Sequence, residues 1–293
     1  MKSKSRLFAL LYIPLLVGFS VYVLLDTFVI GRVYQQEQIS ATEPDTTPRE
    51  PVVTANSYDD GRISVTLTEY REHDTAIYVA DVRLASGEYL KTALAQGSYG
   101  RNIKQTTSEM AAANSAILAV NGDYYGARDK GYVLRNGTLY RSTPSDREAL
   151  IIDAEGRFRI LKERDISPQD LEQENVRQVL SFGPGLIENG QITVDPHTEV
   201  DQATNSNPRT AIAYVDELHY LLVVSDGRTS RSEGLTLYEM AEFLQELGAQ
   251  TAYNLDGGGS STMWFNGQVV NEPVNHGSKV SERRVSDIVY IGA

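Results

Sequence analysis

Short glycine turns between runs of strand-forming residues most strongly constrain the fold of this chain. Asn136-Gly137, Asn189-Gly190 and Asn266-Gly267 each separate two such runs. Both positions of an Asn-Gly pair tolerate the positive φ angles that a two-residue hairpin turn requires. A further hairpin is predicted within residues 149–161, around Glu155-Gly156. Because such turns join adjacent antiparallel strands, the sequence predicts a mostly antiparallel sheet.

Residue spacing elsewhere adds paired strands and a few helices. Residues 63–67 and 77–84 alternate apolar and polar side chains, as in two half-buried strands. The capping-box patterns TTSE, from Thr106 to Glu109, and TLYE, from Thr236 to Glu239, each open a run with helical spacing. A surface helix is expected over 165–174. The predicted fold class is α+β: a mostly antiparallel mixed sheet with a few helices.

The first 30 residues differ in composition from the rest. Residues 7–30 are almost entirely apolar and follow Lys2, Lys4 and Arg6. A run of this length after positive charge predicts one transmembrane helix, with the N-terminus in the cytoplasm and the C-terminal domain extracellular. A cleaved signal peptide is the alternative, but the run is long and no small-residue cleavage site follows. The expected location is therefore the cell membrane, with a single-pass anchor.

Three segments follow from composition: an anchor over 1–30, a polar linker over 31–56 and one domain over 57–293. The linker is rich in proline and acidic residues and lacks apolar periodicity. The net charge of −12 makes nucleic acid an unsuitable partner, because phosphate backbones need a basic face. With no cysteine, thiol catalysis and Cys-ligated zinc are excluded. Residues 200–207 are polar and predicted to be a mobile loop.

The segment 253–263, YNLDGGGSSTM, is the strongest candidate for an active-site loop. An apolar strand is predicted to end at Leu255, and an acid, three glycines and three hydroxyl groups follow. Glycines let a ligand approach the main chain, and successive N–H groups can cradle an anion. A plain glycine turn is the alternative. The polar residues Asn254, Asp256 and Ser260 favour a functional loop, because a simple turn does not need them.

Polar residues also mark the ends of other predicted strands. Asn121 and Asp123 follow the apolar run 117–120, and Asp226 and Arg228 follow the run 218–224. Arg209 stands at the start of another strand. An arginine is often a solvated surface charge, but its forked donors also bind phosphate and carboxylate.

Five ordered blocks together resemble one family. They are NGDYYG at 121–126, PRTAIA at 208–213, SDGR at 225–228, NLDGGGSSTM at 254–263 and RRVSDIVYI at 283–291. The chain resembles the phosphodiester glycosidase domain of the lysosomal mannose-6-phosphate uncovering enzyme and its bacterial relatives, often labelled exopolysaccharide-biosynthesis proteins. The resemblance implies hydrolysis of a sugar 1-phosphodiester in a cell-surface glycan or glycopolymer, which leaves phosphate on the other partner.

This chemistry suggests roles for the candidate residues. Carboxylates act at the anomeric carbon of glycosides, so Asp256 is the first catalytic candidate and Asp226 the second. Charge on the phosphate can be held by guanidinium and main-chain N–H groups. The substrate-binding candidates are Asn121, Asp123, Arg209, Arg228, Asn254, Gly257, Gly258, Gly259, Ser260 and Arg284.

Two other functions fit the same residues. One is a non-catalytic glycan-binding protein of exopolysaccharide or cell-wall assembly. The other is a metal-dependent phosphodiesterase in which Asp123, Asp226 and Asp256 hold a divalent cation. The sequence itself requires no cofactor, although a divalent cation remains an option, and it does not define the oligomeric state.

Overall fold

The computed structural model describes residues 2–36, 50–197, 205–276 and 279–293. Within these residues the chain forms three large sheets, and all of their strand pairings are antiparallel. The predicted hairpins are confirmed: Asn136, Asn189 and Asn266 have φ of 50°, 50° and 44°, each followed by a glycine with positive φ. The mostly antiparallel α+β prediction therefore holds.

In the described part of the chain, the largest sheet has nine strands. In spatial order they are β15 (Gln191–Ile192), β14 (Gly185–Glu188), β18 (Thr251–Asn254), β16 (Arg209–Asp216), β17 (His219–Ser225), β5 (Thr75–Leu84), β4 (Ile63–Glu72), β3 (Ser57–Asp59) and β2 (Val52–Val53). The predicted strands at 63–67 and 77–84 form the centre of this sheet as the long hairpin β4–β5.

Two smaller sheets lie beside it, with five described strands each. One has the order β10 (Thr138–Arg141), β9 (Val133–Arg135), β13 (Val176–Leu180), β11 (Glu148–Asp153), β12 (Phe158–Lys162). The other has the order β20 (Gln268–Val269), β19 (Met263–Phe265), β8 (Leu118–Asn121), β23 (Asp287–Ile291), β6 (Leu90–Leu94). Two-stranded ribbons pair β1 (Arg32–Gln36) with β7 (Ser98–Arg101) and β21 (Val274–His276) with β22 (Lys279–Val280).

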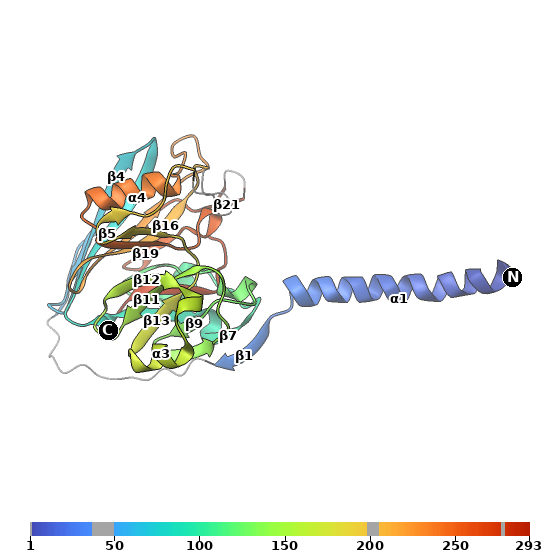
Figure 1. The fold of residues 1–293 in the computed structure, drawn as a ribbon. Helices are drawn as coiled ribbons and strands as arrows, with labels where there is room; N and C mark the ends of the chain where they lie inside the picture. The colour runs from blue at the N-terminus through green and yellow to red at the C-terminus, as the bar shows by residue number, and fades with distance from the viewer. Residues whose placement is uncertain (1, 37–49, 198–204, 277–278) are drawn as a thin grey trace.

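Helices cover the outer faces of the sheets. Helix α4 (Leu237–Glu246) packs on the large sheet, and its capping box joins Thr236 and Glu239 as predicted (Figure 1). Helix α2 (Thr107–Ala113), also with the predicted capping box, covers the β8 sheet, and α3 (Pro168–Gln173) covers the β13 sheet. The main apolar core lies between the large sheet and the two smaller ones.

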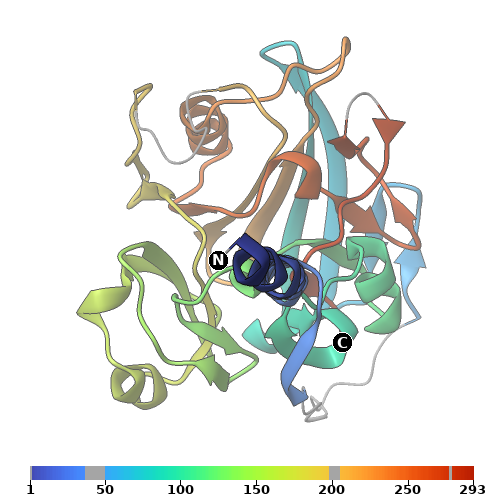
Figure 2. The same ribbon diagram turned by 90° about the vertical axis from the view of Figure 1, so that its right-hand side faces the viewer.

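Helix α1 (Lys2–Phe28) contains most of the predicted membrane anchor and projects away from the sheets (Figures 1 and 2). Among the described residues, no helix is both long enough and apolar enough to cross a membrane. The predicted linker, 31–56, is also more ordered than expected at its ends, because β1 and β2 each pair with a strand of the domain. Main-chain pairing needs no apolar periodicity, so the side-chain pattern did not predict these two strands. Residues 37–49, and most of the predicted loop 200–207, lie outside the described residues.

Candidate active site

Chain turns from all three sheets meet at one pocket of about 400 Å³. Strands β8, β13, β17 and β18 each end close to it, while β16 and α4 begin there. The register explains part of this convergence, since Arg209 at the start of β16 lies opposite Ser225 at the end of β17. The described lining residues are Tyr124, Arg128, Arg147, Phe182, Gly183, Asn207, Arg209, Arg228, Leu237, Asn254, Leu255, Asp256, Gly257, Gly258 and Arg283.

Asp256 provides the carboxylate among these described lining residues. Its main chain is held from the end of β8: Asp256 N donates to Gly122 O at 3.2 Å, and Asn121 Nδ2 donates to Asp256 O at 2.6 Å. The Ser260 hydroxyl donates to Asp256 Oδ2 at 2.6 Å. These bonds fix the carboxylate at the pocket wall.

Burial raises the pKa of Asp256, because a charged carboxylate loses hydration in this position. The Ser260 hydrogen bond and the positive charges of Arg283 and Arg128 partly oppose the rise. A carboxylate tuned in this way suits proton transfer or nucleophilic attack.

Guanidinium groups dominate the rest of the pocket wall. Five arginines line it: Arg128, Arg147, Arg209, Arg228 and Arg283. Burial and the nearby charge of Arg228 lower the pKa of Arg209 to about 10. Burial and Arg283 likewise lower the pKa of Arg228. The pocket is therefore strongly cationic although the whole chain carries −12, and such a site attracts anions.

The three glycines after Asp256 make room for two of these arginines and for the main chain of Pro208. A Cβ atom at Gly258 would lie 2.9 Å from Arg228 Nη2, and one at Gly259 would lie 2.7 Å from Arg283 Nη2. At Gly257 it would lie 3.0 Å from Pro208 O and 3.9 Å from Arg209 Cδ. The triplet thus lets guanidinium groups pack directly on the loop that carries the carboxylate.

The predicted anion cradle of glycine N–H groups needs correction. Gly258 N already donates to Pro208 O at 2.7 Å, and the N–H of Gly257 bonds the Asp256 carboxylate. In place of an open row of N–H donors, the loop presents arginine side chains. Main-chain donors committed to the fold cannot also hold a phosphate.

Asp226 shares the sheet edge with Asp256 but does not line the pocket. It follows β17, as Asp256 follows β18, and β16 lies between these two strands. Its Oδ1 accepts from Asn271 Nδ2 at 3.1 Å and from Glu272 N at 2.9 Å. The structure thus assigns this carboxylate to fixing a neighbouring loop. The catalytic role predicted for Asp226 stays a prediction, and this residue is not among the described residues that line the pocket.

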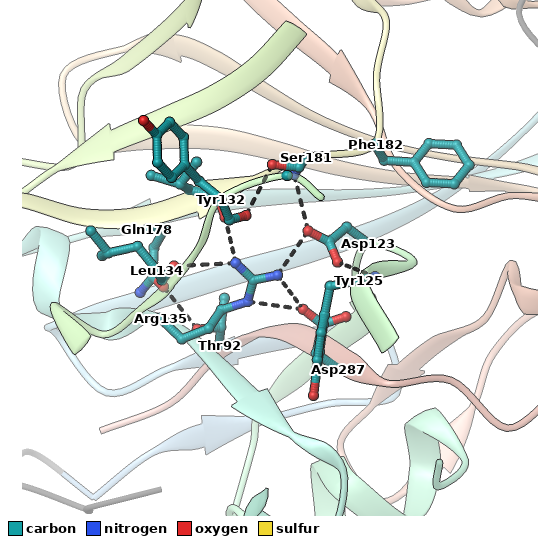
Figure 3. A network of polar contacts seen from close by, with 12 residues as sticks. Thr92, Asp123, Tyr125, Tyr132, Leu134, Arg135, Gln178, Ser181, Phe182 and Asp287 are labelled. Atoms are coloured by element: carbon teal, nitrogen blue, oxygen red, sulfur yellow. Dashed lines mark hydrogen bonds and ion pairs between the residues drawn. The ribbon is translucent and has the colours of Figure 1, made fainter. Parts of the chain in front are cut away.

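Asp123 is fully buried in a separate ionic network (Figure 3). Its Oδ2 accepts from Arg135 Nη2 at 2.8 Å and from Ser181 N at 3.0 Å. Arg135 also donates through Nε, at 2.9 Å, and through Nη2, at 2.7 Å, to Asp287 Oδ2. Asp123 is therefore not exposed to a substrate in the pocket, contrary to its predicted binding role.

The network holds two carboxylates around one guanidinium in a space without solvent. The pKa of Asp287 is raised to about 8 by burial and by the charge of Asp123. Gly122 N donates to Asp287 O at 2.9 Å, and Gly122 O receives the N–H of Asp256. The network thus supports the loop on which the pocket carboxylate depends.

The remaining candidates divide into lining and supporting residues. Arg209, Arg228, Asn254, Gly257 and Gly258 line the pocket, whereas Asn121, Gly259 and Ser260 support it from behind. Arg284 is exposed and its neighbour Arg283 takes the pocket position.

Asn254 offers a polar atom to a ligand. Its Nδ2 donates to Gly183 O at 2.8 Å, while its buried Oδ1 has no hydrogen-bond partner among the described residues. A buried acceptor without a partner is costly, so a donor on a bound sugar would satisfy it.

A three-aspartate metal site is not formed. Asp123, Asp226 and Asp256 each take part in a different hydrogen-bond network. Across the described residues there is no group of three or more His, Asp or Glu side chains suited to a metal ion.

Several pocket residues lacked a signal in the sequence. Arg128, Arg147 and Phe182 lie in turns between predicted strands, far in sequence from Asp256, whereas Tyr124 belongs to the block NGDYYG. Arg283 did have a signal in the sequence, because it belongs to the same arginine pair as the predicted residue Arg284.

Comparisons with known proteins identify the family of the chain. Residues 114–292 match the family model for phosphodiester glycosidases. The chain is 29% identical over 202 residues to mouse N-acetylglucosamine-1-phosphodiester alpha-N-acetylglucosaminidase, covering 61% of this chain and 38% of that protein. The human enzyme of the same name is 39% identical over 111 residues, covering 34% of this chain and 21% of that protein. An uncharacterised prophage-derived protein of Bacillus subtilis is 26% identical over 181 residues, 59% of this chain and 28% of its own length. The chain thus spans well under half the length of these curated relatives.

Solved structures show the same fold. The catalytic domain of the zebrafish N-acetylglucosamine-1-phosphodiester alpha-N-acetylglucosaminidase superposes with a TM-score of 0.63 at 18% identity, covering 90% of this chain and 89% of that one. A hypothetical protein from Synechocystis superposes with a TM-score of 0.60 at 16% identity, covering 78% of this chain and 62% of that one. The family match spans more than half of the sequence, and the chain therefore belongs to the phosphodiester glycosidase family of hydrolases.

Proposed function

We propose that the protein hydrolyses a sugar 1-phosphodiester, and that N-acetylglucosamine 1-phosphodiesters are the first substrates to test. The observation that carries the proposal is one carboxylate, Asp256, in a pocket lined by five arginines. An ordinary glycosidase uses two carboxylates, one of which protonates the leaving group. A phosphate monoester leaves as a stable anion, so guanidinium groups can replace that acid.

The proposed reaction breaks the bond between the anomeric carbon and the phosphate oxygen. Water supplies the oxygen that ends on the anomeric carbon, and its two protons are shared between the released sugar and the buffered solution. The phosphate stays on the other partner as a monoester. Asp256 acts either as the base that activates water or as a nucleophile, and Arg209, Arg228 and Arg283 stabilise charge that develops on the phosphate.

The test is release of N-acetylglucosamine from its 1-(methyl phosphate) by the wild type and by Asp256→Asn. We expect the variant to lose several orders of magnitude in kcat, about the loss seen when other catalytic groups are removed. Asp129→Asn is a matched control, because the Asp129 side chain is 79% exposed and lies outside the pocket. Near-wild-type turnover by Asp256→Asn, at equal thermal stability, would rule out the proposed role.

Two other functions are separated by the same assay. Binding of the substrate without turnover by the wild type would favour a glycan-binding protein. Loss of turnover after chelator treatment, with recovery on adding a divalent cation, would favour a metal-dependent phosphodiesterase.

We further propose that residues 7–30 anchor the protein in a cell membrane and that the domain acts outside on a cell-surface glycan or glycopolymer. The support is the basic cluster before this segment and the exposed apolar side chains of α1, such as Leu15, Phe19 and Leu24. Protease added to intact cells should remove the domain. Full protection of the domain in intact cells, with digestion after lysis, would contradict this topology.

A further inference from the structure

The pocket holds more positive charge than one phosphodiester needs. Arg128 donates to Ser181 O at 2.7 Å, Arg228 to Asn207 Oδ1 at 2.8 Å and Arg283 to Asn275 Oδ1 at 3.0 Å. Within the described residues, none of these three guanidinium groups forms an ion pair with a carboxylate. A phosphodiester carries one negative charge and Asp256 another. The third guanidinium is left without a counter-charge in a partly desolvated site, which is unfavourable.

These cations belong to two groups on different walls. Arg228 and Arg283 pack on the glycine loop, as the close approaches at Gly258 and Gly259 show. Arg128 lies instead over the ring of Phe182, 4.9 Å from its centroid, and 5.9 Å from that of Tyr124.

The causes of the pKa shifts of these arginines agree with this division into two groups. Burial and then Arg283 lower the pKa of Arg228, whereas burial and then Arg147 lower the pKa of Arg128. The charges of Arg283 and Arg128 both lower the pKa of Asp256. The carboxylate is therefore close to both cationic groups.

The wall with Arg128 has the features of a sugar site. It contains two aromatic rings, which pack well on the apolar faces of sugars. The free acceptor Asn254 Oδ1 is on this side as well, because Asn254 Nδ2 bonds the carbonyl of Gly183, next to Phe182. The glycine loop after Asp256, on which the guanidinium groups of Arg228 and Arg283 pack, fits the reacting phosphate.

We propose that the sugar itself carries a second anionic group, a phosphate or carboxylate on a ring substituent, which Arg128 binds. This inference rests on the proposed function, since it assigns the two walls to the two ends of a sugar 1-phosphate. With one face on Phe182, the guanidinium of Arg128 keeps donors at its edge for a charged oxygen pair. The substrate class is thus a sugar 1-phosphodiester that is anionic at both ends of the sugar, as in a glycopolymer linked through phosphates.

The test compares two substrates, N-acetylglucosamine 1-(methyl phosphate) and the same compound with a 6-phosphate. We expect the wild type to favour the second in kcat/KM by about 10- to 100-fold, the range for hydrogen bonds to charged groups. Arg128→Gln should abolish this ratio, and Arg128→Lys should restore part of it. Arg228→Gln is the comparison variant, because it should lower kcat/KM for both substrates and keep their ratio. The 1-(methyl phosphate) of N-acetylmuramic acid carries a carboxylate in place of the 6-phosphate. Comparing its kcat/KM with that of the 6-phosphate compound shows whether Arg128 prefers a carboxylate or a phosphate.

Equilibrium binding makes the result independent of turnover. Asp256→Asn is titrated with N-acetylglucosamine 1-phosphate and with the 1,6-bisphosphate. Tighter binding of the bisphosphate that disappears on adding Arg128→Gln supports the second anion site, even if no substrate is hydrolysed and the proposed function fails. Equal affinities, or a preference that persists without Arg128, would overturn the inference while leaving hydrolysis of neutral sugar phosphodiesters intact.

Discussion

Replacing the carboxyl group of Asp287 with an amide tests whether the buried network beneath the pocket behaves as its geometry requires. The pKa of Asp287 is raised to about 8 in the folded protein, chiefly by burial and then by Asp123. In the unfolded chain an aspartate titrates at about 3.9. Between these two values the folded state holds a proton that the unfolded state has lost, so stability falls as pH rises through this window.

The expected slope is about 1.4 kcal/mol per pH unit, which gives a loss of about 3 kcal/mol between pH 5 and pH 7. Asp287→Asn has no such proton and should lack this loss, so its stability relative to the wild type rises with pH. Asp123 does not cancel the effect, because its pKa is lowered and it titrates below the window. Arg135 stays charged throughout, since both carboxylates raise its pKa.

The assay is urea unfolding of the wild type and Asp287→Asn at pH 5, 6 and 7. Asp129→Asn is again the control, because it removes the same charge from an exposed position. The control curve should run parallel to that of the wild type, and the Asp287→Asn curve should not. Parallel curves for all three proteins would refute the argument that Asp287 is protonated in the fold.

Two other substitutions test how the pocket is built. Gly258→Ala places a Cβ 2.9 Å from a guanidinium at a position with φ of 62°, and should raise KM as well as cost about 1–3 kcal/mol of stability. Gly267→Ala is the control, because Gly267 has φ of 95° and a Cβ there would have no atom within 4 Å. This variant should lose stability but not activity. Equal KM values for the two variants would contradict the packing role of Gly258. Asn121→Ala leaves the carbonyl of Asp256 without its 2.6 Å donor and should lower kcat about 10-fold or more, with a stability loss of about 1–3 kcal/mol. An unchanged kcat, measured on the same substrate, would show that the loop holds its place without Asn121.

Local sequence rules predicted the scaffold well because the relevant interactions are local. The hairpin turns at Asn136, Asn189 and Asn266 depend on two adjacent residues, and each has the expected positive φ. The helix capped by Thr236 depends on contacts three residues apart. The main omissions were strands β1 and β2, which are fixed by main-chain pairing, β1 with the distant strand β7 and β2 with its neighbour β3.

The site was predicted only in part because its members come from separate turns. Asp256, Arg209 and Arg228 stood out at strand ends, and all three line the pocket. Asp226 stood out for the same reason, but position at a strand end does not fix where a side chain points, and Asn271 holds it elsewhere. Arg128 gave no sign, since its role depends on Phe182, more than fifty residues away.

The arrangement of charge also indicates how binding and turnover are divided. Burial and, after it, the repulsion between neighbouring guanidinium groups lower the pKa values of Arg209 and Arg228 in the pocket. An anionic substrate relieves this repulsion, and so the guanidinium groups contribute to binding before any bond breaks. Asp256 has the opposite effect, because its charge opposes that of the incoming phosphate at short range. On the proposed function, this cost in binding is offset only if the carboxylate acts in the transition state. On the proposed function, the arginines therefore act on the phosphate both in the bound substrate and in the transition state, whereas Asp256 contributes in the transition state alone.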